Sequence, residues 1–183
     1  MRKIMTLLAS LTLLVTVTSC EIEPITSGYA VFFKCDMTRP PFDQITSSGQ
    51  FITVRRNKSN GSYVVTDFKG DTTYHYLSKP ELLATNNRGY DYGLGGLIIG
   101  TPSMQDGNSK ICAYDLACPN CDNPRHRLEL ARDATGHATC HNCGVVFGLN
   151  IGGIPVQGKG NGKKRVLWPY TCNIFGMEVE VIN

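Results

Sequence analysis

Four cysteines in two identical spacings constrain this sequence more than any other feature. Cys118 and Cys121 form one Cys-x-x-Cys pair, Cys140 and Cys143 form a second, and 18 residues separate the pairs. Two residues between thiolates let both sulfur atoms of a tight turn bind one ion, and two facing turns complete a tetrahedron. Gly144 follows the second pair and favours the left-handed conformation that turns backbone N–H groups towards the sulfurs. The sequence therefore predicts that these four cysteines bind one metal ion.

The segment between the two pairs has the pattern of a β-hairpin. Residues 128–132 and 137–139 are short strand-like runs, and residues 133–136, Asp-Ala-Thr-Gly, have the composition of a turn. Such a hairpin would return the second pair to the first, so we expect a small metal-binding subdomain over about residues 115–150. His141 lies inside the second pair, but with four cysteines available we expect its side chain to project outward.

Two other chemistries use cysteines in this pattern. In an oxidising compartment the four thiols would form two disulfides. A Cys-x-x-Cys pair is also a thiol–disulfide exchange motif, although that motif opens a helix after a strand, and two copies facing each other would be unusual. We favour the metal centre, because the spacing, the doubling and the trailing Gly144 agree with one another.

The first twenty residues have the pattern of a signal peptide. Two basic residues precede a run of 14 apolar or small residues (4–17), which is shorter than the roughly 20 that a membrane-spanning helix needs. Small residues then lead to Cys20, and the segment resembles the lipobox of bacterial lipoproteins. The resemblance implies that residues 1–19 are removed and that Cys20 is acylated. Residues 20–28 would then tether the protein to a membrane of the bacterial cell envelope, on the periplasmic side or at the outer membrane.

The rest of the chain has the pattern of a mainly β protein. Short runs of β-branched and aromatic residues alternate with clusters of Gly, Pro, Asn and Asp. Asn60 and Gly61 favour a tight hairpin turn, and residues 178–181 alternate acidic and apolar side chains, as expected for a strand with one buried face. The one helical pattern covers residues 79–84, with a proline in its first turn. We expect strands at residues 29–33, 50–54, 63–68, 97–99, 111–114, 145–149, 166–170 and 177–182.

Charge and length exclude several functions. A formal net charge of +3, spread evenly over 183 residues, is too small to indicate nucleic-acid binding. A chain of this length buries about 70% of its unfolded surface, so its core does not need disulfides. Cys35, Cys112 and Cys172 remain once Cys20 and the four ligands are assigned; at most one pair of them can form a disulfide, and we expect small buried thiols. The basic glycine-rich segment 158–165 lacks the phosphate-loop pattern, so we expect a solvated loop.

The C-terminal half resembles a Rieske-type domain. Residues 111–119 are similar to the strand and loop that lead into the first ligand box of that family, and residues 140–147 are similar to the second box. Residues 148–170 are similar to its Gly- and Pro-rich loop and final strands. The resemblance covers about residues 90–183 and implies a Rieske-like β domain over residues 29–183. Its stacked antiparallel sheets would carry a small metal subdomain like that of rubredoxin or a zinc ribbon.

The ligand positions depart from that family. A Rieske centre holds a [2Fe–2S] cluster with two cysteines and two histidines. Here Asn120 and Cys143 stand where the histidines are expected, and Val145 replaces a serine that bonds to the cluster. We therefore do not expect a high-potential Rieske cluster. Four thiolates in paired turns suit a single tetrahedral ion, for which Zn²⁺ is the first choice; mononuclear iron and an all-cysteine [2Fe–2S] cluster are the alternatives.

Together these patterns predict a membrane-anchored lipoprotein whose metal-binding domain is a structural or accessory binding module. A site closed by four cysteines has no open coordination position, so zinc there would not activate water. No Ser/His/Asp or paired-carboxylate pattern indicates another active site. The alternative is an electron carrier in which the same ligands hold iron. Its partner in the cell envelope would be another protein, and nucleic acid is not expected.

Overall fold

The computed structural model describes residues 27–57, 61–86, 88–103, 110–133, 135–159 and 165–183. Cys20, the predicted signal peptide and most of the tether lie outside these residues. Within them the chain folds into two antiparallel sheets, and the predicted mainly β class is confirmed. No helix among the described residues is both long and apolar enough to cross a bilayer.

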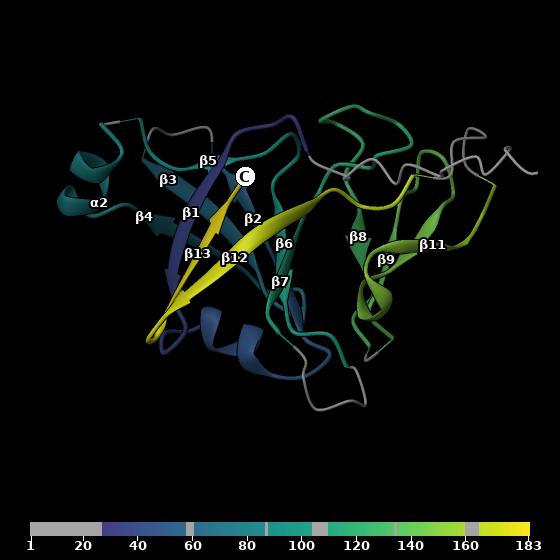
Figure 1. Cartoon of the computed structure of the whole chain (residues 1–183), viewed down its shortest axis with the longest axis horizontal. Helices are drawn as coiled ribbons and strands as arrows, with labels where there is room; N and C mark the ends of the chain where they lie inside the picture. The colour runs from purple at the N-terminus through teal and green to yellow at the C-terminus, as the bar shows by residue number, and fades with distance from the viewer. Residues whose placement is uncertain (1–26, 58–60, 87, 104–109, 134, 160–164) are drawn as a thin grey trace, which may run out of the picture.

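The larger sheet has nine strands among the described residues, in the order β4-β3-β2-β6-β7-β12-β13-β1-β5, and every neighbouring pair is antiparallel. In chain order these strands are β1 (Val31–Asp36), β2 (Phe51–Arg56), β3 (Ser62–Thr66), β4 (Thr72–Tyr76), β5 (Asp91–Tyr92), β6 (Leu97–Gly100), β7 (Cys112–Asp115), β12 (Pro169–Phe175) and β13 (Glu178–Ile182). Figure 1 shows these strands crossing the left and centre of the molecule.

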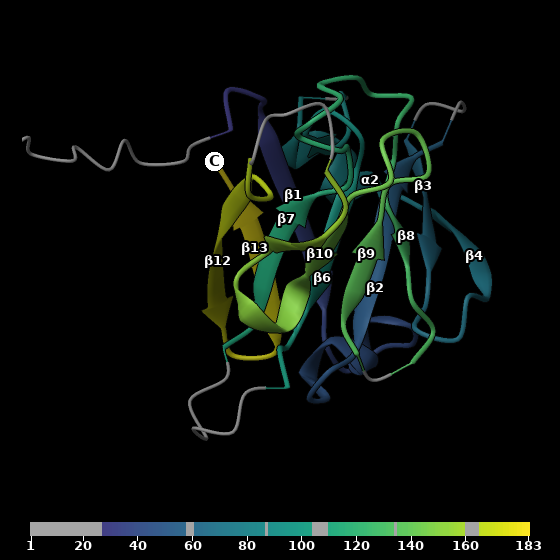
Figure 2. The ribbon, with the colours of Figure 1, turned by 90° about the vertical axis from the view of Figure 1, so that its right-hand side faces the viewer.

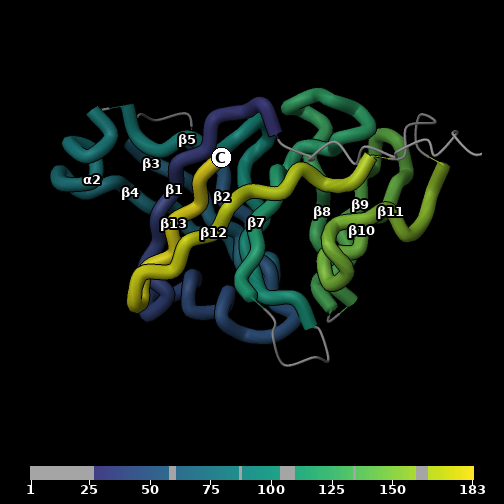
Figure 3. Tube along the Cα trace, viewed as in Figure 1, coloured from purple at the N-terminus to yellow at the C-terminus, as the bar shows by residue number. Residues whose placement is uncertain are grey.

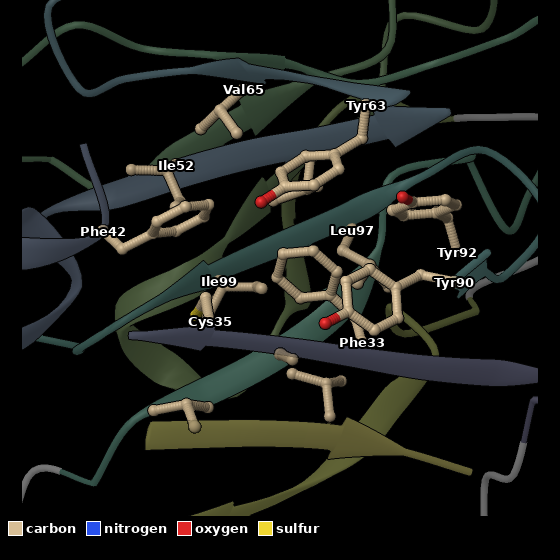
Figure 4. Packing of buried hydrophobic residues seen from close by; sticks show 14 of the residues in the cluster. Phe33, Cys35, Phe42, Ile52, Tyr63, Val65, Tyr90, Tyr92, Leu97 and Ile99 are labelled. Atoms are coloured by element: carbon tan, nitrogen blue, oxygen red, sulfur yellow. The ribbon is translucent and has the colours of Figure 1, made fainter. Parts of the chain in front are cut away.

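This sheet folds over on itself, so that strands far apart in the sheet order face each other across one core. Phe33 of β1 packs edge-on against Tyr63 of β3, with ring centroids 5.5 Å apart, although five strands lie between β1 and β3 in the sheet order. Aliphatic side chains from the middle of the sheet, Ile52 and Ile99, complete the same cluster and are fully buried (Figure 4). Burial of this apolar surface is what holds the folded-over sheet closed.

The smaller sheet has the order β11-β10-β9-β8 and packs on the outer face of the larger one (Figure 2). Its strands are β8 (Glu129–Leu130), β9 (His137–Thr139), β10 (Val146–Gly148) and β11 (Ile154–Gln157). Between the sheets lies a second core, in which Ile98 and Tyr114 of the large sheet meet Phe147 of β10. Successive residues of a strand point to opposite faces, so Ile98 enters this second core while its neighbours Leu97 and Ile99 enter the first.

Two short helical segments flank the large sheet. The predicted helix is α2 (Lys79–Ala84), and it begins with a capping box in which Ser78 and Glu81 bond to each other's backbone N–H groups. The 3-10 helix η1 (Phe42–Thr46) was not predicted; its Phe42 and Ile45 side chains are buried in the first core. A second 3-10 turn, η2 (Leu149–Ile151), follows β10 and replaces the end of the strand expected over 145–149.

Every expected strand has a counterpart, but several boundaries move. The largest shift is in β12, which runs from Pro169 to Phe175 where a strand over 166–170 was expected. Three strands were missed: β4 is mostly polar and exposed, β5 has two residues, and β11 contains a proline. The alternation over 178–181 is confirmed, since Val179 and Val181 are buried. The expected turn at Asn60 lies outside the described residues, although β2 and β3 do pair as the two arms of a hairpin.

The hairpin expected between the two cysteine pairs is present. Its arms are β8 and β9, and they pair with Glu129 opposite Thr139 and Leu130 opposite Ala138. Gly136 ends the connecting turn with a positive φ of 64°. The tube view in Figure 3 shows this hairpin beside β10 and β11, apart from the folded-over part of the large sheet.

Candidate metal centre

The four predicted ligands come together from two loops at one end of the small sheet. Cys118 and Cys121 lie in the loop that follows β7, and Cys140 and Cys143 lie between β9 and β10. Their four Sγ atoms all lie within 4.8 Å of one another. The closest contacts cross between the loops: Cys118 to Cys143 is 3.6 Å, and Cys121 to Cys140 is 3.7 Å.

These distances fit a single tetrahedral ion. Four metal–sulfur bonds of about 2.3 Å place the sulfur atoms of a regular tetrahedron about 3.8 Å apart. A disulfide would require about 2.05 Å between two of the sulfur atoms. All four cysteines are free thiols in the structure, with the sulfur spacing of a metal site and not of two disulfides.

The two cysteine loops share one backbone geometry. The N–H of Gly144 donates to the Cys140 carbonyl at 2.8 Å, and in the first loop the N–H of Asp122 donates to the Cys118 carbonyl at 2.9 Å. Both donors have positive φ, 70° at Gly144 and 50° at Asp122. The sequence indicated this conformation only at the glycine. Aspartate is among the few other residues that visit the left-handed region, so the second position was detectable in principle.

Backbone and amide N–H groups point at the sulfur atoms. The Cys140 sulfur accepts from the N–H groups of Asn142 and Cys143, and the Cys118 sulfur accepts from the N–H of Cys121. The side-chain amide of Asn142 also donates to the Cys121 sulfur at 3.3 Å. Burial raises the pKa of the Cys118 thiol. Burial also acts on Cys140, but the backbone N–H donors and the neighbouring thiols of Cys118 and Cys143 together outweigh it and lower the pKa of that thiol, which favours the thiolate that binds metal.

The cluster has a buried side and an accessible side. Cys118 and Cys140 are completely buried and pack in the second core with Phe147. Cys121 and Cys143, the second cysteine of each loop, are partly exposed. An ion held by all four would therefore sit at the edge of the core, with two of its sulfur ligands reaching the surface.

A fully buried carboxylate, Asp115, holds the first cysteine loop in place. It accepts hydrogen bonds from the N–H groups of Leu94 (2.7 Å), Gly95 (3.0 Å) and Ala117 (2.7 Å), and from the Tyr170 hydroxyl (2.6 Å). These donors come from three separate parts of the chain. The sequence analysis missed this residue, because its partners are up to 55 residues away and no local pattern marks them.

Two residues near the cysteines take other roles. The Asn120 side-chain oxygen accepts from the backbone N–H of Arg165 at 3.3 Å, so it anchors a later loop while Cys121 joins the sulfur cluster. His141 is exposed, as expected, and its Nε2 lies 2.7 Å from a Glu129 carboxylate oxygen. Val145 is buried in the second core.

The three remaining described cysteines lie in the large sheet. Cys35 is buried and Cys112 and Cys172 are partly buried, so the expectation of small buried thiols holds fully only for Cys35. Burial raises the pKa of all three, to about 12, 11 and 12 respectively, which leaves them protonated at neutral pH. Most of the basic segment 158–165 lies outside the described residues.

Comparisons with known protein families, with curated proteins and with solved structures found no match to this chain. The geometry of the site is therefore what supports a function.

Proposed function

We propose that this protein is a bacterial lipoprotein whose β domain binds one metal ion, Zn²⁺ by preference, through Cys118, Cys121, Cys140 and Cys143. The observation that carries the proposal is the convergence of their four Sγ atoms within 4.8 Å of one another. Four thiolates are the ligand set of structural zinc and of mononuclear iron sites.

The spacing of the sulfur atoms supports one ion over a [2Fe–2S] cluster. A two-iron cluster holds two thiolates on each iron, so the two pairs are separated by more than the edge of one tetrahedron. Here all four Sγ atoms lie within 4.8 Å of one another, so neither pair of sulfur atoms is set apart from the other. The contacts of 3.6 Å and 3.7 Å between cysteines of different loops also match the edge of about 3.8 Å that one tetrahedral ion requires.

The bound ion would act as a structural crosslink. It joins the loop after β7 in the large sheet to the loop between β9 and β10 in the small sheet, and so fastens one sheet to the other. With all four positions filled by sulfur, zinc has no place for water or substrate and supplies no catalysis. The domain is then a binding or accessory module whose shape depends on the metal.

An electron carrier with mononuclear iron is the second candidate, and one observation favours it. Cys121 and Cys143 are partly exposed while Cys118 and Cys140 are fully buried. Two surface sulfur ligands would give a redox partner close access to the ion. The N–H donors around the sulfur atoms suit iron as well as zinc, because hydrogen bonds to thiolates tune the reduction potential of iron–sulfur sites.

The Rieske-like origin of the domain is part of this proposal. It is supported by the resemblance of residues 111–119 and 140–147 and by the position of both ligand loops at one end of a small sheet packed on a larger one. In that relationship, Cys121 and Cys143 take over from the two histidines of the family.

Metal analysis of anaerobically purified protein tests the site. We expect one equivalent of zinc in a colourless protein; one equivalent of iron with thiolate absorption bands in the visible would select the electron carrier. The Cys121→Ser variant should lose most of the metal. The Cys112→Ser variant is the matched control, because that partly buried cysteine lies outside the cluster, and it should keep the metal. Full metal content in Cys121→Ser, or metal-free protein with two disulfides by mass, would contradict the proposal.

Membrane fractionation tests the anchor. The Cys20→Ala variant should be unprocessed or released from the membrane fraction, because Cys20 is the position that the lipobox resemblance assigns to acylation. The Cys112→Ser control should stay membrane-bound, and its mature N-terminus should carry the mass of the acyl chains. A Cys20→Ala protein that is processed and firmly bound would refute the lipoprotein assignment and leave the metal site untouched.

A further inference from the structure

A cleft of about 170 Å³ lies between the two sheets, away from the four cysteines. Thr53 and Thr66, from β2 and β3 of the large sheet, line one wall, and the segment around β8 of the small sheet lines the other. Figure 2 shows β8 in front of these strands. The volume is about that of five or six water molecules in the liquid, which is enough for a small organic molecule.

Three guanidinium groups from separate elements converge on this cleft. Arg55 belongs to β2, Arg127 pairs with Ala117 in an isolated bridge, and Arg132 follows β8. Arg127 is held in place because its Nε donates to the Gly95 carbonyl at 2.7 Å, and its two terminal nitrogens are left for another acceptor.

The position of Arg132 depends on a glycine in the opposite wall. A Cβ atom on Gly70 would lie only 2.4 Å from the Arg132 Cζ atom, so the absence of a side chain there makes room for the guanidinium. Gly70 also has a φ of +92°, which favours glycine independently.

These three cations form no ion pair with a carboxylate among the described residues. None of the ion pairs in that part of the chain includes Arg55, Arg127 or Arg132. Partial burial, and then the charge of Arg55, lower the pKa of Arg127, while the charge of Asp115 raises it, so Arg127 lies close enough to Arg55 for the two cations to repel each other. An anion between them would relieve that repulsion.

Two acidic residues line the same cleft, but each has partners elsewhere. The Asp67 carboxylate accepts from the N–H of Asp71 at 2.8 Å and from the side-chain amide of Gln44 at 3.3 Å. The Glu129 carboxylate lies 2.7 Å from the His141 ring. They reduce the positive charge of the cleft to one net unit without forming ion pairs with its arginines.

The rest of the lining is apolar. Leu116 and Leu128 are buried, and Phe68 and Leu130 are partly buried with surface facing the cleft. A ligand with a charged head and an apolar body would thus meet both guanidinium groups and leucine and phenylalanine side chains in the same cleft.

We propose that this cleft is a binding site for a small organic anion, a carboxylate or a phosphate monoester with an apolar body. The anionic group accepts charge-assisted hydrogen bonds from Arg55, Arg127 and Arg132, and the apolar body packs on Phe68 and Leu130. The site goes beyond the proposed metal-binding function and uses none of the metal ligands, so it stands or falls separately from that function.

Binding of model ligands tests the site, with the full-length folded protein, as purified, titrated by calorimetry and by amide NMR. The probes are benzoate, phenyl phosphate, and benzamide as a neutral molecule of the same shape. We expect saturable one-to-one binding of benzoate or phenyl phosphate, with shifts confined to the cleft, and at least tenfold weaker binding of benzamide. Which anion binds more tightly identifies the preferred head group.

Substitutions in the cleft complete the test. Arg55→Gln and Arg132→Gln should each weaken anion binding about tenfold or more, because each removes charged hydrogen bonds. Arg125→Gln removes the same charge from an exposed position outside the cleft and should change nothing. If Arg55→Gln fails to fold, anion binding by the Arg132→Gln variant tests the proposal, because Arg132 is exposed and its substitution should not affect folding. Equal binding of benzamide, an equal loss in Arg125→Gln, or no saturable binding would each overturn the proposal.

Discussion

At the scale of single residues, the metal loops depend on two positions with left-handed backbone. Gly144 and Asp122 occupy the same place in their loops, directly after the second cysteine, and each donates its N–H to the carbonyl of the first cysteine of its pair. The conformation costs a residue with a side chain about 1 kcal/mol or more, and it costs glycine nothing. Asp122 bears that cost and also forms an ion pair with Arg165 at 3.5 Å.

Gly144→Ala should therefore destabilise the metal-loaded protein by about 1 kcal/mol and speed the release of metal. A Cβ atom at this position has no neighbour within 4 Å, so backbone strain is the only cause. The matched control is Gly152→Ala, because Gly152 has a φ of +83° and an equally open Cβ position outside the cysteine loops. Urea unfolding should show similar losses for both variants, and metal transfer to a chelator should accelerate only in Gly144→Ala.

Equal chelation rates for these two variants would show that the geometry of the second loop does not control the site.

The buried Asp115 is the other residue on which the first loop depends. Asp115→Asn should destabilise the protein by about 3 kcal/mol. In the wild-type protein both carboxylate oxygens accept from N–H groups, whereas in the variant one oxygen is replaced by an NH₂ group that cannot accept. Asp122→Asn is the control, since its half-exposed carboxyl meets solvent, an arginine and the Tyr29 hydroxyl, and it should cost less than about 1 kcal/mol. Both are measured by chemical denaturation, and a cost at Asp115 no larger than at Asp122 would show that the network is dispensable.

At the scale of elements, the β8–β9 hairpin is the part that most needs a metal. Its strands have two and three residues, too few to be stable on their own. The ion would lend its binding free energy to the folding of this subdomain, of order 10 kcal/mol in small zinc-dependent peptides at neutral pH. The large sheet has a separate core around Phe33 and Tyr63 and does not share that dependence.

Removing the metal should therefore loosen residues 115–150 and leave the large sheet folded. Hydrogen exchange with and without chelator should show a gain in exchange at the cysteine loops and the hairpin, while β2 and β13 keep their protection. Exchange throughout β2 and β13 after chelation would mean that the metal holds the whole fold. No change anywhere, including the cysteine loops, would indicate that the cysteines hold no metal.

At the scale of the whole molecule, the proposed lipid anchor would keep the metal end near the membrane. The Tyr29 hydroxyl donates to Asp122 of the first cysteine loop at 3.2 Å, and the Tyr29 ring packs on Trp168 with centroids 5.6 Å apart. Eight residues, 21–28, connect Cys20 to this point, and a chain of that length spans at most about 28 Å.

Energy transfer from Trp168, the single tryptophan, to a dansyl-labelled lipid measures this distance. We expect transfer when the acylated protein is reconstituted in vesicles, and a clear loss when about 20 flexible residues are inserted within the tether, since a longer linker lets the domain move away. Cys20→Ala protein mixed with the same vesicles provides the baseline. Unchanged transfer after the insertion would show that something other than the tether holds this end at the membrane.

Much of the architecture could be read from local patterns, for identifiable reasons. The strand over 178–181 was evident because burial of one face requires alternation, and the helix at Lys79–Ala84 because a proline lies in its first turn. Strand β4 was missed because both Tyr74 and Tyr76 are exposed, so no buried face shaped its sequence. Strand β12 was misplaced because its partners β7 and β13, and not its own residues, set its limits.

The chemistry of the metal site was present in the sequence itself, because the spacing of two cysteines in one turn is a local property that needs no knowledge of the fold. The sequence did not reveal three other features: the unequal burial of the four sulfur atoms, the role of the Asp115 carboxylate, and the three arginines that line the cleft. Arg55 and Arg127 are 72 positions apart, and they meet only because the small sheet packs on the outer face of β2. Such contacts arise when two sheets bury a common core. Which distant segment a strand packs against is not encoded in the alternation of its own residues, so neither segment shows the contact in its sequence.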